Sequence, residues 1–425
     1  MIQSFLLSLY TLIYSIVLLC LLPFEYLKRP KGLRNRWLKE RLGYVSLENI
    51  KPRSKKIWIH AVSVGEVIAS IPFIHEVKEK MPAVDLILTT VTDTGQNIAR
   101  ERLSGTAEIH YLPFDLPFSI KRFMKIMKPS LYISIETEIW PNLFRLLKID
   151  GTPVLIMNGR ISDDSFKGYR KIRFFMKRIL SYVDLFCMQD ELYGERIAAL
   201  GAEKDKIRIT GNFKFDIKIE GYKKKWVRYL KRPVILAGST HETEEEMLLD
   251  AFKRLRASGD MTLIIAPRHP RRFDEVEEII RKGGFNYLRI SEIDGAVRDG
   301  GPIEAEVILI DVIGELASLY SICDLAIIGG SFSGRGGHNP LEPAFWGRPF
   351  ICGEDMGNFP FVDEFYKRGA AIMTSRKALY EVLEQLLLSE DQRLIMGERA
   401  REIYKERSGA VSRSIEILER YIELP

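Results

Sequence analysis

The chain has 425 residues, of which 46% are apolar and 28% charged, and its formal net charge is +6. This length exceeds what one hydrophobic core usually supports, so we expect two domains of about 180 residues each. The composition is that of a globular protein. Its four cysteines lie far apart and form no Cys-x-x-Cys pair, which argues against a disulfide framework and against a zinc site.

Residues 5–24 carry no charged side chain and are long enough to cross a hydrocarbon core as a helix. They lack the basic start and the small residues of a cleaved signal peptide, so we predict a retained membrane anchor over residues 1–26. A basic juxtamembrane segment follows over 27–56. Because basic residues beside a span stay in the cytoplasm, the rest of the chain should be cytoplasmic. The same residues supply much of the net charge, which favours anionic lipid over nucleic acid as the partner.

Short apolar runs then alternate with helical patterns, as expected for parallel sheets covered by helices on both faces. The first seven predicted strands are 57–62, 86–91, 109–112, 131–135, 154–157, 185–188 and 207–210. A charged stretch interrupts the pattern, which resumes with strands predicted at 234–237, 263–266, 307–310, 325–328 and 370–373. We therefore predict an α/β protein with a Rossmann-like domain over 57–215, a linker over 216–232, and a second such domain with terminal helices over 233–425.

A glycine-rich loop follows the predicted strand at 325–328. Residues 329–337 contain five glycines, and Asn339 and Pro340 then suit the start of a helix, with Glu342 three residues after the cap. Backbone N–H groups at a helix start attract anions. A phosphate site is the favoured interpretation of this loop, and a structural turn is the alternative.

Several polar residues follow the ends of predicted strands, where ligands of parallel sheets bind. Glu66 falls in the first turn of a helix, where a carboxylate can act as a general base or can simply cap the helix. Glu136 and Glu138 suit acid–base chemistry or a solvated turn, and Arg160 suits a carboxylate or phosphate ligand or a surface ion pair. Residues 166–180 form an amphipathic basic helix, compatible with solvent or with lipid headgroups.

Seven motifs together resemble those of a known family, the 3-deoxy-D-manno-octulosonic acid (Kdo) transferases of lipopolysaccharide assembly. The motifs lie at 60–66, 136–142, 158–162, 211–216, 239–242, 267–270 and 329–342. The resemblance covers nearly the whole chain, including the N-terminal apolar segment. It implies the GT-B glycosyltransferase fold, with two Rossmann-like domains facing a cleft and an N-terminal transmembrane or membrane-anchoring helix.

The resemblance also implies an activity, an inverting transfer of Kdo from CMP-Kdo to a lipid A precursor at the bacterial inner membrane. It assigns the role of proton acceptor to Glu66 and requires no metal or other cofactor. The donor-binding residues that it implies in the second domain are Pro267, Arg268, Ile313, Gly314, Glu315, Asn339, Pro340, Leu341 and Glu342.

Two other functions compete with this interpretation. One is a membrane-associated GT-B enzyme that uses a UDP-sugar and another lipid, because a diphosphate would also suit the glycine-rich loop. The other is a membrane-tethered nucleotide-binding or scaffold protein without catalysis. Release of UDP or of CMP distinguishes the UDP-sugar enzyme from a Kdo transferase. The effect of replacing Glu66 distinguishes the non-catalytic protein from an enzyme.

Overall fold

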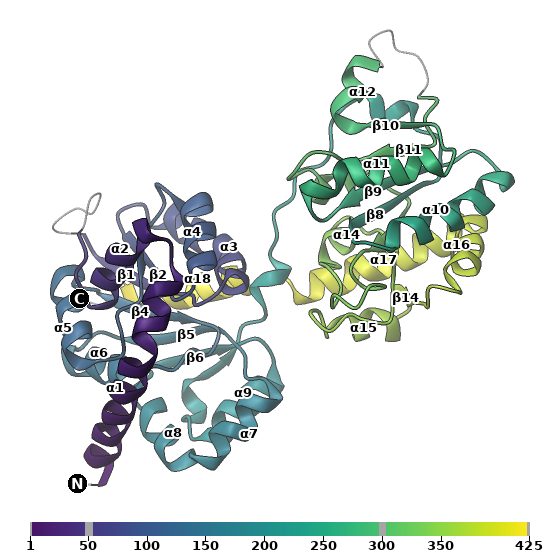
Figure 1. Ribbon diagram of the computed structural model, residues 1–425. Coiled ribbons are helices and arrows are strands. Elements are labelled where there is room, and N and C mark those ends of the chain that lie inside the picture. Colours follow the sequence, from purple (N-terminus) through teal and green to yellow (C-terminus); the bar gives the residue numbers. More distant parts are fainter. Residues whose placement is uncertain (1, 47–53, 297–302, 423–425) are drawn as a thin grey trace. The chain divides into compact units, whose positions relative to one another are not determined.

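The computed structural model describes residues 2–46, 54–296 and 303–422, which form two compact units (Figure 1). Unit 1 comprises Met1–Asp216 and Ser408–Pro425, and unit 2 comprises Ile217–Arg407. Each contains one seven-stranded sheet in which every pairing is parallel. The first segment of unit 1 ends at Asp216, one residue after the predicted domain boundary at residue 215.

The sheet of unit 1 has the strand order β3-β2-β1-β4-β5-β6-β7. Its strands are β1 Lys56–His60, β2 Asp85–Thr90, β3 Glu108–Tyr111, β4 Leu131–Ile135, β5 Val154–Gly159, β6 Leu185–Met188 and β7 Ile207–Ile209. They are buried on both faces apart from the edge strand β7, as the continuous apolar runs predict. All seven coincide with strands predicted from the sequence.

Helices cover both faces of this sheet. They are α1 Ile2–Lys28, α2 Lys31–Arg41, α3 Val64–Lys80, α4 Asp93–Leu103, α5 Pro117–Met127, α6 Pro141–Asp150, α7 Asp163–Lys171, α8 Arg173–Leu180, α9 Glu191–Leu200 and α18 Ala410–Ile422, with the short 3-10 helices Lys204–Lys206 and Phe213–Phe215. One core joins α3, α4 and α18 to the sheet, and the other joins α5, α6, α8 and α9 to its opposite face.

The last helix corrects the predicted domain division, which placed all terminal helices in the second domain. Helix α18 lies beside α3 in unit 1 (Figure 1), and its Val411, Ile415 and Leu418 belong to the core around Phe73. These three residues form an apolar stripe at helical spacing that requires a covering surface. The carboxylate of Asp216 fixes the return of the chain by accepting the backbone N–H of Val411 at 2.6 Å.

The sheet of unit 2 has the order β10-β11-β9-β8-β12-β13-β14. Its strands are β8 Val234–Thr240, β9 Thr262–Pro267, β10 Tyr287–Arg289, β11 Val307–Leu309, β12 Leu325–Ile328, β13 Phe350–Cys352 and β14 Ala371–Met373. The sequence did not predict β10 or β13. Neither lies in a run of four apolar residues, and β10 is half-exposed, so neither leaves a clear pattern in the sequence.

The helices of unit 2 connect these strands. They are α10 Glu244–Leu255, α11 Phe273–Lys282, α12 Ile290–Ala296, α13 Leu316–Leu319, α14 Leu341–Phe345, α15 Val362–Lys367, α16 Leu379–Leu388 and α17 Glu390–Arg407, with 3-10 helices at Lys225–Tyr229, Arg256–Ser258 and Pro270–Arg272. All but the first residue of the predicted linker at 216–232 belongs to this unit, and its Trp226 is buried.

Candidate functional site

Glu66 lies in the first turn of α3, directly after the carboxyl end of β1. Its carboxylate accepts the backbone N–H of Val62 at 2.7 Å and the hydroxyl of Ser63 at 3.0 Å, so it does serve as a helix-start partner. The side chain is nevertheless buried, which raises its pKa from 4.5 to about 7, with a further contribution from the charges of Glu136 and Glu138. The same carboxylate therefore stabilises the helix and is suited to exchange a proton near neutral pH.

Two further carboxylates and two cations lie at the same edge of the sheet of unit 1. Glu136 and Glu138 follow β4, and burial raises the pKa of both. Arg160 follows β5 and places its Nε 3.8 Å from Glu136 Oε2, while Lys214 also interacts electrostatically with Glu136. The structure thus brings together strand-end segments that are more than 20 residues apart in sequence.

His60 is a structural residue at this edge. Its buried ring contacts the carbonyl oxygen of Thr89 through Nδ1 at 3.0 Å and accepts the indole N–H of Trp140 through Nε2 at 3.3 Å. Nδ1 must carry the proton in this arrangement, so the ring is neutral, and burial lowers its pKa to about 3. His60 therefore positions Trp140, which begins α6, and is not suited to accept a proton at neutral pH.

In unit 2, a cationic cluster lies after β8 and β9 and in the glycine-rich loop. His241 and His338 place their Nε2 atoms 2.8 Å apart, and both rings have pKa values lowered by burial and by neighbouring cations, His338 to about 4. Arg268 is exposed beside them, and the positive charge of Arg335 helps to lower the pKa of His241. An anion is the ligand that such a cluster favours.

The glycine-rich loop itself differs from the expected phosphate cradle. Glu244, which is 1% exposed at the start of α10, accepts the backbone N–H groups of Gly330 at 2.8 Å and Phe332 at 3.0 Å. Asp355 accepts that of Gly336 at 2.8 Å. Three N–H groups expected to bind a ligand are thus satisfied by the protein's own carboxylates.

The helix after the glycine-rich loop is short. Helix α14 has only five residues, and Asn339 accepts the backbone N–H of Leu341 at 3.1 Å while its amide donates to Glu342 at 3.3 Å. Burial raises the pKa of Glu342 to about 7, and Arg268 opposes this shift. These residues therefore form a bonded turn next to Arg268. Leu341 has no exposed side chain, so only its backbone is available to a ligand.

The comparisons with known proteins identify the family of the chain. The family model described as 3-deoxy-D-manno-octulosonic-acid transferase (kdotransferase) matches residues 36–217. A 3-deoxy-D-manno-octulosonic acid transferase of Haemophilus influenzae is 35% identical over 424 residues, which is 97% of each chain. The chain belongs to the Kdo transferase family. The transferase of Aquifex aeolicus is 31% identical and covers 84% of this chain and 92% of its own length.

Solved structures establish the fold of this Kdo transferase. MurG of Acinetobacter baumannii aligns with a TM-score of 0.54 at 14% identity, covering 86% of this chain and 99% of its own. A structure described as a putative UDP-N-acetylglucosamine 2-epimerase of Listeria monocytogenes gives the same TM-score and identity over 87% and 97%. The Kdo transferase therefore has the GT-B-like fold that its motifs suggested. Its membership of the Kdo transferase family makes it a glycosyltransferase.

The remaining donor residues predicted for the Kdo transferase lie in two segments of unit 2. Pro267 ends β9 and is buried, directly before Arg268. Ile313, Gly314 and Glu315 precede α13. The side chain of Ile313 is 76% exposed, and Glu315 accepts the hydroxyl of Tyr222 at 3.0 Å. An exposed apolar side chain at a strand-end loop is suited to cover the flat face of a base.

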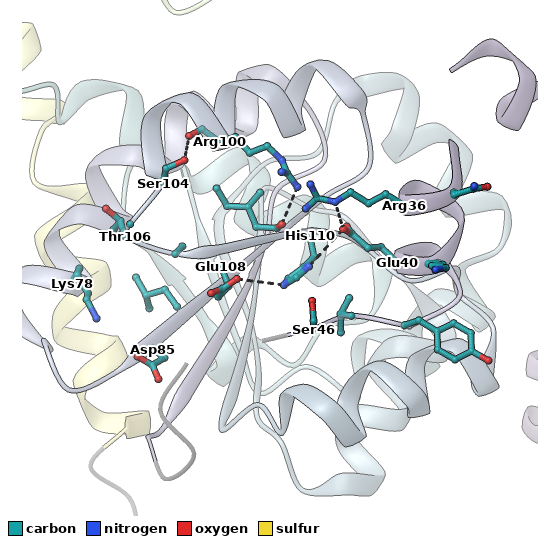
Figure 2. A pocket seen from close by; sticks show the side chains of 18 residues that line it. Arg36, Glu40, Ser46, Lys78, Asp85, Arg100, Ser104, Thr106, Glu108 and His110 are labelled. Carbon is teal, nitrogen blue, oxygen red and sulfur yellow. Dashed lines mark hydrogen bonds and ion pairs between the residues drawn. The ribbon is translucent and has the colours of Figure 1, made fainter. Parts of the chain in front are cut away.

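A pocket of about 970 Å³ in unit 1 lies away from Glu66 (Figure 2). Its lining includes Asp85 and Glu108, which begin β2 and β3, so it lies at the opposite ends of the strands. His110 lies 3.9 Å from both Glu40 and Glu108, and Arg36 pairs with Glu40 at 2.6 Å. The backbone N–H of Tyr111 in β3 donates to the carboxylate of Glu40 in α2 at 2.8 Å, which attaches α2 to this edge strand. We assign the pocket no part in the transfer.

Proposed function

We propose that this Kdo transferase moves Kdo from CMP-Kdo to a glucosamine hydroxyl of a lipid A precursor, with inversion at the anomeric carbon. The observation that carries the proposal is the environment of Glu66. A buried carboxylate with a pKa of about 7, held by two hydrogen bonds at a strand end, has the properties that a general base requires.

The proposed reaction is a single displacement. Glu66 takes the proton of the acceptor hydroxyl, the hydroxyl oxygen forms a bond to the anomeric carbon of Kdo, and the bond from that carbon to the CMP oxygen breaks. Glu136 and Glu138 favour this role, because their negative charges help to raise the pKa of Glu66. Arg160, exposed and weakly paired at 3.8 Å, is our candidate partner for the Kdo carboxylate.

Unit 2 holds the leaving nucleotide in this proposal. The exposed guanidinium of Arg268 binds the phosphate of CMP, with Asn339, Pro340, Leu341 and Glu342 in the adjacent turn. The residues Ile313–Glu315 and Pro267 complete the site. Positive charge near the phosphate stabilises the negative charge that develops as CMP leaves, and this stabilisation requires no metal ion.

We further propose that the protein works at the cytoplasmic face of the bacterial inner membrane. The structure contains one helix, with Phe5–Lys28 as its apolar part, that is long and apolar enough to cross a membrane. Lys28 ends this helix and Arg29 and Lys31 follow it, and basic residues beside an apolar helix are attracted to the anionic lipids of the cytoplasmic leaflet. This location gives the enzyme access to a lipid acceptor.

One experiment tests the reaction. Purified enzyme is incubated with a tetraacylated lipid A precursor and either CMP-Kdo or UDP-sugars, and the released nucleotide and the mass of the lipid product are measured. We expect release of CMP and a lipid heavier by one or more Kdo units. Release of UDP without CMP would show that the alternative transferase is the correct interpretation.

A further inference from the structure

The apolar helix α1 has two different faces. One face contacts unit 1: Leu7 is buried in the core with α6 and α8, and Tyr10 and Tyr14 make polar contacts with that unit. Leu18 and Leu22 continue the same stripe against the cluster around Trp37 and Phe114. The spacing of three or four residues between these positions is that of one helix face.

Polar contacts hold the N-terminal half of α1 on unit 1. The hydroxyl of Tyr10 donates to Asp115 Oδ2 at 2.8 Å, and the backbone N–H of Asp115 donates to the hydroxyl oxygen of Tyr14 at 3.2 Å. Thr11 bonds to the amide of Asn142 at 3.0 Å. We call these contacts the Tyr10–Asp115 lock.

Asp115 belongs to the framework of unit 1. It is 1% exposed, and its carboxylate accepts the backbone N–H groups of Asn142 at 3.1 Å and Leu143 at 2.9 Å, at the start of α6. These bonds satisfy N–H groups that the helix itself leaves without partners. The lock therefore joins α1 to a residue that cannot leave the interior without disrupting α6.

The other end of α1 is held as well. Arg29, directly after the helix, pairs with Asp93 of α4 at 3.1 Å and with Glu25 at 3.0 Å. Its guanidinium also lies 3.9 Å from the ring centre of Trp37 in α2. Contacts near both ends fix the direction of the helix along unit 1, as Figure 1 shows for the dark purple helix.

These contacts conflict with a helix that crosses the bilayer. A crossing segment from Phe5 to Lys28 places Tyr10 and Tyr14 roughly 8 and 14 Å from its apolar end, within a hydrocarbon core about 30 Å thick. The buried Asp115 and Asn142 would have to lie at that depth too. Placing a charged group and a protein surface in lipid is costly, so the docked helix and the crossing helix exclude each other.

The opposite face of α1 is apolar and exposed. Its side chains, each at least 39% exposed, are Phe5, Leu9, Leu12, Ile13, Ile16, Leu19, Phe24 and Leu27. Soluble proteins rarely expose so long an apolar surface, and such surfaces mark contacts with membranes or proteins. The apolar face runs along the whole of α1, and a continuous surface of this length suits contact with lipid.

Charge on the neighbouring helix selects a lipid bilayer over a protein partner. The ring centres of Tyr10 and Phe175 of α8 lie 6.0 Å apart, so α8, against which α7 packs, adjoins the docked helix. Phe174 is 62% exposed there. The exposed basic residues of these helices are Lys167, Arg170, Lys171, Arg173, Lys177 and Arg178. An apolar strip with an adjacent basic surface complements a membrane that contains anionic phospholipid.

We infer that α1 lies in the plane of the membrane surface, held on unit 1 by the Tyr10–Asp115 lock, with its outer face among the acyl chains of an anionic bilayer. The helix then tethers the enzyme without crossing the bilayer, and α7–α8 face the headgroups. This arrangement does not depend on which sugar or lipid the enzyme uses.

A depth measurement on the full chain tests the inference. Cys20 is exposed and the other three cysteines are buried, so the native protein accepts a fluorophore at residue 20. Phe5→Cys and Phe24→Cys, each combined with Cys20→Ser, place the same label near the two ends of the outer face. The labelled proteins are bound to vesicles of phosphatidylcholine and phosphatidylglycerol, and lipids with spin labels at shallow and deep positions quench the fluorescence.

We expect the labels at residues 5, 20 and 24 to lie at one shallow depth. A crossing helix would instead separate residues 5 and 24 by roughly 28 Å along the membrane normal, since each residue advances the helix by about 1.5 Å. That gradient would overturn the inference. An unquenched label at all three positions would also overturn it, because it would indicate that protein, such as a second copy of the chain, covers the outer face.

A matched pair of substitutions tests the lock. Tyr10→Ala removes the hydroxyl that bonds Asp115, whereas Tyr26→Ala removes a tyrosine of the same helix whose hydroxyl bonds the exposed Asn35. We expect Tyr10→Ala to move the label at residue 5 away from the common depth and Tyr26→Ala to leave it there. An unchanged depth in Tyr10→Ala would refute the role of the lock.

Discussion

Replacing Glu66 with glutamine removes the proposed base and keeps its contacts. The amide oxygen can still accept the N–H of Val62, and the amide nitrogen can donate to the hydroxyl oxygen of Ser63, the two partners of the carboxylate. We expect transfer to fall by about 10²- to 10⁴-fold, the usual contribution of a general base. Binding of CMP, which the proposal assigns to unit 2, should be unchanged.

The stability of the variant gives an independent check on the burial of Glu66. Burial raises the pKa in the folded protein from 4.5 to about 7, so the folded state holds this proton more tightly than the unfolded chain does. Ionisation of Glu66 therefore weakens folding progressively as the pH rises from 4.5 to 7, and the full cost applies above that range. From a shift of roughly 2.5 units the cost is about 3 kcal/mol. Glu66→Gln avoids it and should be at least as stable as the wild type at pH 8.

The assay follows release of CMP against pH, together with thermal unfolding at pH 8. In the wild type the rate should rise with pH and reach half its plateau near pH 7. Glu138→Gln removes a like charge, so it should shift this midpoint to lower pH. Retention of more than about a tenth of the wild-type rate by Glu66→Gln would refute the catalytic role. A midpoint near pH 4.5 would show that burial does not raise the pKa of Glu66.

Three further predictions concern unit 2. Arg268→Gln should raise the KM for CMP-Kdo about tenfold or more, which is the loss expected for a charged hydrogen bond. The unfolding temperature should not change, because the side chain of Arg268 is exposed. An unchanged KM would show that Arg268 does not belong to the donor site. Glu244→Ala should cost about 1–3 kcal/mol of stability in denaturant unfolding, since two buried loop N–H groups lose their partner. Arg272→Ala should cost about 3–5 kcal/mol of stability, because it leaves Glu245 as a buried, unpaired charge. Glu245 has no exposed side chain and pairs with Arg272 at 2.8 Å. The double variant Arg272→Ala with Glu245→Gln should recover part of that loss.

Much of the fold was predictable because its signals are local. Most predicted strands lie in mainly apolar stretches of four or more residues, and their alternation with helical patterns implies parallel sheets. The strands β10 and β13 were missed because the sequence has at most three consecutive apolar residues at each of them. The glycine-rich loop was located correctly, but the carboxylates that fill part of it come from Glu244 and Asp355, which are distant in sequence from Gly330.

The sequence by itself determined the strand-end positions of Glu66, Arg268 and the glycine-rich loop, since the order of strands, turns and helices along a chain is encoded by neighbouring residues. Only the tertiary structure decided the burial, the charge and the contacts of the groups in the chain. The pKa of Glu66 depends on burial and on Glu136 and Glu138, the return of α18 depends on an open face beside α3, and the docking of α1 depends on Asp115, about 100 residues away. Burial and charge are set by residues distant along the chain, and only folding brings them together.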